Sequence, residues 1–128
     1  MSKPSGAVTT ATLRSLLEAF NAHDLDAIMA FFADDCELLT PRGPAPEGRR
    51  FCGKAAVREG LASRFMGLPD VHYGDARHWV AGNLGVSTWL LTGATKTGEG
   101  IRVRGVDLLE FREGKIARKD SYWKIVEK

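Results

Sequence analysis

The chain has 128 residues, 44% of them hydrophobic, which suits one ordinary domain with an apolar core. Its 18 basic and 16 acidic side chains nearly balance, and they form no long basic run. We therefore expect a single domain over residues 1–128, with a frayed segment at residues 1–8 and no nucleic acid as partner.

The start of the chain and its cysteines bear on its compartment. Residues 1–6 lack the cationic and apolar parts of a signal peptide, and no apolar run is long enough to span a bilayer. Cys36 and Cys52 have no metal-ligand spacing and are typical of reduced thiols. These features predict a soluble, cytoplasmic protein that does not contact a membrane.

The first half of the chain has helical patterns. A first amphipathic helix begins behind Thr10 or Thr12 as cap and ends near residues 21–23. A second follows, with Asp24 as cap and an end at residues 33–35. Its buried stripe and that of the first helix consist of apolar residues at helical spacing: Leu13, Leu16, Leu17, Phe20, Leu25, Ile28, Met29 and Phe32.

After the second helix, residues 36–40 read as a short strand, and three prolines make residues 41–48 a loop. A third helix is expected over residues 54–65, where Val57, Leu61 and Phe65 are one turn apart.

From residue 71 onward the hydrophobic period changes to two. Candidate strands lie at residues 72–80, 86–92, 101–111 and 116–126, separated by turns that each contain glycine. An antiparallel meander is the economical topology. Because helices come first and strands afterwards, we expect an α+β fold in which three helices cover one face of a curved, mostly antiparallel sheet and leave a cone-shaped interior.

Asp107 interrupts the apolar face of one predicted strand. It alternates with residues that should all point into the core or a pocket: Ile101, Val103, Gly105, Leu109 and Phe111. A carboxyl group there must be paired, kept protonated or placed for a ligand, because burying it alone would cost several kcal/mol, on the order expected for a desolvated charge. A structural carboxylate satisfied by a neighbouring cation or amide remains the alternative to a functional one.

Four segments together resemble one known family, the SnoaL-like, ketosteroid isomerase-like branch of the nuclear transport factor 2 superfamily. They are Phe20-Asn21-Ala22-His23-Asp24-Leu25-Asp26-Ala27-Ile28, Phe31-Phe32-Ala33-Asp34-Asp35-Cys36, Gly53-Lys54-Ala55-Ala56-Val57-Arg58-Glu59 and Phe111-Arg112-Glu113-Gly114-Lys115-Ile116. The resemblance covers nearly the whole chain and implies the cone fold. The superfamily includes isomerases, polyketide cyclases, epoxide hydrolases, dehydratases and non-catalytic members, so the fold implies a site location and little more.

Two enzyme patterns of the superfamily fit poorly. The isomerase base, an Asp before a Pro, corresponds to Thr40, and its oxyanion tyrosine corresponds to Leu16. A threonine hydroxyl cannot abstract a carbon-bound proton unaided. The epoxide hydrolase Asp on the last strand falls at Ser121. The oxyanion-donating acid of the isomerases does have a counterpart in this chain, Asp107. Resemblance to polyketide cyclases makes Asp107 and Asp120 candidate acid/base groups.

Lys119 is the candidate partner of Asp107. If the last strand turns Lys119, Ser121 and Trp123 inward, the ammonium can lie near Asp107, as a proton-transfer pair or as a buried ion pair. The opposite phase would turn Arg118, Asp120, Tyr122 and Lys124 inward; periodicity does not decide, and the family alignment favours Lys119.

The remaining site candidates would bind substrate. Thr40 at the loop mouth could hydrogen-bond a ligand or merely close a turn, and Trp89 and Trp123 could wall a flat hydrophobic ligand or belong to the core. Ser121 accompanies them on the inward face. The three histidines receive no catalytic role, and with no phosphate loop, dinucleotide fingerprint or metal cluster we expect no cofactor and no metal.

Two functions follow as hypotheses. The first is a cofactor-independent isomerase, lyase, dehydratase or cyclase acting on a hydrophobic carbonyl compound, with catalytic Asp107 and Lys119; the rival is a non-catalytic domain that binds a small ligand or a protein. Val106, Leu108 and Tyr122 point away from the pocket, and because related proteins commonly dimerise through that face, the resemblance implies a homodimer.

Overall fold

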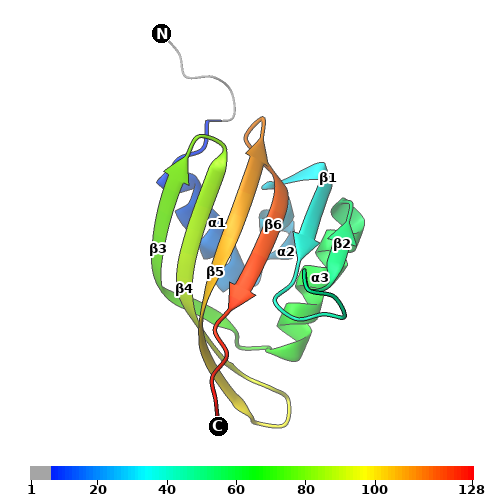
Figure 1. Ribbon diagram of the computed structural model, residues 1–128, viewed down its shortest axis with the longest axis vertical. Helices are drawn as coiled ribbons and strands as arrows, with labels where there is room; N and C mark the ends of the chain where they lie inside the picture. Colours follow the sequence, from blue (N-terminus) through cyan, green and yellow to red (C-terminus); the bar gives the residue numbers. More distant parts are fainter. Residues whose placement is uncertain (1–6) are drawn as a thin grey trace.

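A computed structural model describes residues 7–128, so residues 1–6 of the expected frayed segment lie outside the described residues. Within that segment, Val8 packs against the core. The predicted α+β fold is confirmed: Figure 1 shows the helices behind one face of the sheet, with α3 beside β1 and β2. The elements are α1 (Thr10–Asn21), α2 (Leu25–Met29), β1 (Phe32–Leu39), β2 (Arg50–Cys52), α3 (Lys54–Gly67), β3 (His72–Ala81), β4 (Leu84–Ala94), β5 (Gly100–Arg112) and β6 (Lys115–Trp123).

The cap of α1 is Thr9 rather than the expected Thr10 or Thr12. Thr9 has an extended backbone, and its hydroxyl accepts a hydrogen bond from the Thr12 N–H while Thr12 Oγ1 accepts one from the Thr9 N–H. This reciprocal capping box requires the first threonine to lie just outside the helix. Asp24 caps α2 as predicted, accepting from the Ala27 N–H at 3.1 Å.

The predicted end of the second helix, at residues 33–35, is wrong. The helix ends at Met29, and Phe32 already pairs with Ile116 of β6 at the start of β1. Phe32 is fully buried, and burial is consistent both with its helical spacing and with its place in a strand. The sheet prevails because its pairing also satisfies the backbone of residues 32–39.

The sheet has the order β2-β1-β6-β5-β4-β3. Strands β3 to β6 form the predicted antiparallel meander, and β1 pairs with β6 in parallel. The three-residue edge strand β2 was not predicted, because it lies between the proline-containing loop and α3 and is too short to show a period. None of the described helices is long and apolar enough to cross a membrane.

A register shift in β6 determines which side chains face the helices. The pairing slips between Glu110 and Phe111, so Ala117 becomes the extra residue between two paired positions, Ile116 and Arg118. Ile116 is fully buried, and after the slip Lys119 is buried as well. The predicted inward phase of Lys119 and Ser121 is therefore confirmed; the same alternation also predicts that Ala117 points inward, and the slip breaks the alternation there.

Candidate functional site

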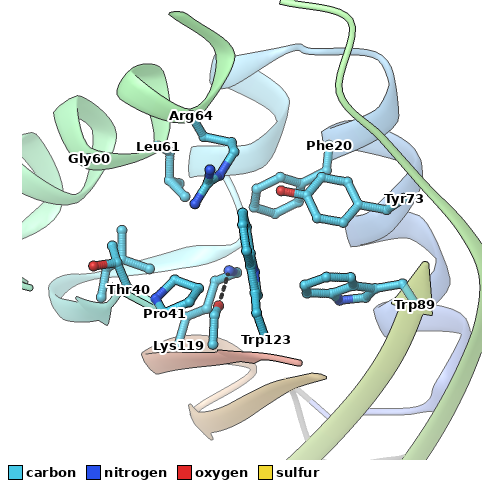
Figure 2. A pocket seen from close by; sticks show the side chains of 12 residues that line it. Phe20, Thr40, Pro41, Gly60, Leu61, Arg64, Tyr73, Trp89, Lys119 and Trp123 are labelled. Carbon is cyan, nitrogen blue, oxygen red and sulfur yellow. Dashed lines mark hydrogen bonds between the residues drawn. The ribbon is translucent and has the colours of Figure 1, made fainter. Parts of the chain in front are cut away.

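A small cavity of about 30 Å³ lies between the inner face of the sheet and helices α1 and α3 (Figure 2). This volume holds roughly one water molecule. Four aromatic side chains contribute to its walls, together with polar groups from α3 and β6. The lining residues are Phe20, Leu38, Thr40, Pro41, Gly60, Leu61, Arg64, Tyr73, Trp89, Lys119, Ser121 and Trp123.

Asp107 lies behind this wall, on β5, with only 6% of its surface exposed. Trp89 Nε1 donates to its Oδ2 at 3.0 Å, and Ser121 Oγ donates to its Oδ1 at 2.6 Å. Lys119 Nζ lies 3.2 Å from the same Oδ1. Both carboxylate oxygens thus have partners, as a buried carboxylate requires.

Lys119 forms the polar floor of the cavity and is 7% exposed. Its ammonium donates to Ser121 Oγ at 2.8 Å and lies 5.4 Å from the centre of the Phe20 ring. Lys119, Ser121 and Asp107 therefore form a hydrogen-bonded chain in which Ser121 accepts from the lysine and donates to the carboxylate. The prediction that Lys119 lies near Asp107 is confirmed.

Gly105 makes room for the indole that binds Asp107. A Cβ atom at Gly105 would lie 2.4 Å from Trp89 Cη2, a distance that no real contact has. Gly105 pairs with Trp89 across β4 and β5, so the ring lies directly over its backbone. Only glycine permits this close approach.

The opposite wall of the cavity contains two residues that sequence reasoning missed, Tyr73 and Arg64. Tyr73 packs edge-on against Trp89, with ring centres 4.9 Å apart, and burial raises the pKa of its phenol well above the ordinary value. Its hydroxyl therefore stays protonated at neutral pH. Arg64, from α3, holds its guanidinium carbon 4.5 Å above the Trp123 ring. Tyr73 belonged to a predicted strand, and Arg64 to a predicted helix, but neither pattern showed which cavity they would reach.

The structure places Thr40 at the cavity rim, but its hydroxyl makes its hydrogen bonds within the loop. Thr40 Oγ1 donates to the Arg42 carbonyl at 2.7 Å and accepts from the Arg49 N–H at 3.1 Å. These bonds close the turn, which was one of the two readings of this residue. Trp89 and Trp123 both line the cavity, and Trp89 is also fully buried core.

Asp120, the second candidate acid/base group, and the residues given no role lie away from the cavity. Leu16, at the position of the isomerase tyrosine, is buried in the core. Asp120 is on the outer face of the sheet, where its carboxylate is 3.8 Å from Arg118 and accepts from the Tyr122 hydroxyl. His23 Nε2 lies 2.6 Å from the Val71 carbonyl, and His78 Nδ1 lies 2.8 Å from Ser87 Oγ. Among residues 7–128 no cluster of histidine, cysteine or acidic side chains could hold a metal ion.

Comparisons with solved structures agree with this fold. A protein from Xanthomonas campestris pv. campestris, named as a candidate polyketide cyclase, is 24% identical with a TM-score of 0.80, covering 90% of this chain and 89% of its own. An NTF2-like protein of unknown function from Mesorhizobium loti is 26% identical with a TM-score of 0.74, covering 97% of both chains. TerC, crystallised with polyporic acid, is 19% identical with a TM-score of 0.77, covering 90% of both chains.

The sequence profile of the SnoaL-like domain matches residues 13–119, most of the chain. The match begins within α1 and ends within β6 at Lys119, before the cavity residues Ser121 and Trp123. The chain belongs to the SnoaL-like family.

Proposed function

We propose that the protein binds a small hydrophobic carbonyl compound in this cavity and acts on it, without a cofactor, as an isomerase, lyase, dehydratase or cyclase. The observation that carries the proposal is the Lys119-Ser121-Asp107 chain, whose lysine end opens into an aromatic-walled cavity. Buried polar chains of this kind have well-defined geometry because every member has a partner. Among the solved relatives, one named as a candidate polyketide cyclase and one named as a candidate isomerase share the fold.

In this proposal Lys119 contacts the substrate. Its ammonium donates a hydrogen bond to the carbonyl oxygen and stabilises the negative charge that develops there during isomerisation, elimination or ring closure. Asp107 holds the lysine in place by charge. Ser121 connects the cavity with Asp107, so a proton leaving the substrate passes to the carboxylate through the serine hydroxyl. Trp89 and Trp123 supply the apolar walls, and Thr40 positions the loop at the rim.

A second function, that of a non-catalytic domain that binds a small ligand or a protein partner, is favoured by the cavity size. A cavity of about 30 Å³ admits no substrate of this class unless its walls move. Both oxygens of Asp107 are also already engaged.

One series of measurements separates the two functions. A thermal-shift screen of small ketones, lactones, epoxides and steroids on wild type and on Asp107→Ala identifies ligands that need the site. Each ligand is then followed by NMR for turnover, with Asp107→Asn and Lys119→Met as variants. Turnover that falls in both variants supports the enzyme. Full turnover in Asp107→Asn would remove the acid/base role, and binding without turnover in wild type would support the binding domain.

We also propose that the protein is a homodimer through the outer face of the sheet. Tyr122 and Trp79 are 55% and 51% exposed, and Val106 and Leu108 lie between them on β5, on a face that no helix of residues 7–128 covers (Figure 1). An exposed apolar patch of this kind is typical of an interface between copies. Light scattering should find a dimer at micromolar concentration that Leu108→Glu dissociates. Met66→Glu, which alters an exposed apolar residue on α3, away from this face, is the control and should leave the dimer intact.

A further inference from the structure

The charges around the cavity do not balance, and the excess charge is on Arg64. Lys119 and Asp107 neutralise each other at 3.2 Å. Arg64 is half-buried and lines the cavity, yet no carboxylate of residues 7–128 lies within 4 Å of its guanidinium. The guanidinium rests on the Trp123 ring instead. The cavity walls therefore have a net positive charge.

Among residues 7–128 no neighbouring group supplies the missing anion. Besides Arg64 and Lys119, the ionisable side chain in the cavity wall is Tyr73, and burial holds it in the neutral form although Arg64 acts in the opposite direction. The phenol is therefore a neutral donor. Guanidinium groups have five donors in a planar fork that matches a carboxylate, and neither the Trp123 ring face nor the neutral Tyr73 phenol supplies an anion for them.

We propose that the ligand of this cavity is a planar carboxylate or a similarly acidic enol on an aromatic or other flat apolar body, with Arg64 as its anion-binding residue. The inference rests on the proposed function, because it names the substrate class of the same cavity. Arg64 lies across the cavity from Lys119 in Figure 2, so one end of the ligand can meet the guanidinium while a carbonyl oxygen meets the ammonium. The ring of the ligand would pack among Phe20, Tyr73 and Trp89.

Binding must enlarge the cavity, and Arg64 and Trp123 allow this. Trp123 is the last residue of β6, and residues 124–128 beyond it have no regular structure. Arg64 is held at the ring by the cation–π contact and by no ion pair among the described residues. When the Arg64 guanidinium rotates toward the carboxylate of a bound ligand, it leaves the Trp123 ring. The side chains of Arg64 and Trp123 then both vacate part of the entrance. The proposal therefore predicts that an anion changes the environment of Trp123.

The test uses two probes that differ in charge and little else, 2-naphthoate and 2-naphthamide, on the full chain. Affinities are measured by calorimetry, and the Trp123 indole N–H is followed by NMR. Wild type should bind the acid about tenfold more tightly than the amide, a preference of the size that one charge-assisted bidentate contact supplies. Arg64→Gln should remove that preference, and Arg64→Lys should retain part of it. Arg58→Gln is the matched control on α3, because Arg58 is exposed and bonds Asp26 outside the cavity.

The outcomes separate this inference from the proposed function. Equal affinity for acid and amide in wild type, or a preference that persists in Arg64→Gln, would overturn the anion inference. If the amide and neutral ketones still bind in that case, the proposed function stands. If neither probe binds at millimolar concentration, the anion inference is overturned, and the proposed function is overturned with it when no ketone, lactone, epoxide or steroid of the thermal-shift screen binds either. Circular dichroism and the unfolding temperature of Arg64→Gln show whether a lost preference reflects lost folding, and Arg64→Lys provides the folded comparison in that event.

Discussion

The buried pair of Asp107 and Lys119 makes the most direct prediction about stability. In Asp107→Asn the Trp89 indole can still donate to the amide oxygen, and Ser121 can reverse to accept from the amide nitrogen. Lys119, however, is left with less than a tenth of its side chain exposed and no anion beside it. Removing one partner of such a pair costs about 3–5 kcal/mol.

For a domain of 128 residues, about 3 kcal/mol lowers the unfolding temperature by roughly 10 °C. Urea unfolding of four proteins measures the effect: wild type, Asp107→Asn, Lys119→Met and the double variant. The double variant contains neither charge, so its loss should be smaller than the sum of the single losses by about 2 kcal/mol.

The exposed pair of Arg58 and Asp26 is the internal control. Its side chains are 45% and 86% exposed, so Asp26→Asn should cost less than about 1 kcal/mol. Two results would refute the reasoning: an Asp107→Asn loss no larger than that of the control, or a coupling energy in the cycle below about 0.5 kcal/mol. Either would mean that the pair is solvated in solution.

Burial and a nearby arginine lower the pKa of His78 below its ordinary 6.5, so the unfolded chain binds this proton more readily. The free energy of unfolding should therefore fall as the pH drops from about 6.5 toward 5, and His78→Asn should flatten that part of the urea-midpoint profile; an unchanged profile would contradict the assignment. Cys36 is fully buried with a raised pKa, whereas Cys52 is exposed, so a disulfide exchange reagent should titrate one thiol quickly in native protein and none quickly in Cys52→Ser. Gly105→Ala should destabilise by about 1–3 kcal/mol and shift the tryptophan emission because its methyl displaces Trp89; a neutral effect on both would show that the indole does not lie over this backbone.

Local patterns were sufficient for most of the fold. Strands have a side-chain period of two, and one face of this sheet is buried, so alternation alone predicted that Asp107 and Leu109 share the inner face. Where a residue satisfied two patterns, as Phe32 did, the sequence could not choose, and pairing with β6 decided. The slip at Ala117 is also invisible to a period-two reading, because it changes the phase within one strand.

The sequence by itself determined, through alternation, that the Asp107 carboxylate lies on the inner face of β5; Lys119 became its candidate partner through the family pattern, because periodicity left the phase of the last strand open. Only the tertiary structure decided what surrounds them. Strand register brings Trp89 and Ser121 to the two oxygens of Asp107, and the packing of α3 brings Arg64 to the cavity. These contacts join residues far apart in the chain, so they depend on how the elements pack and not on any local spacing.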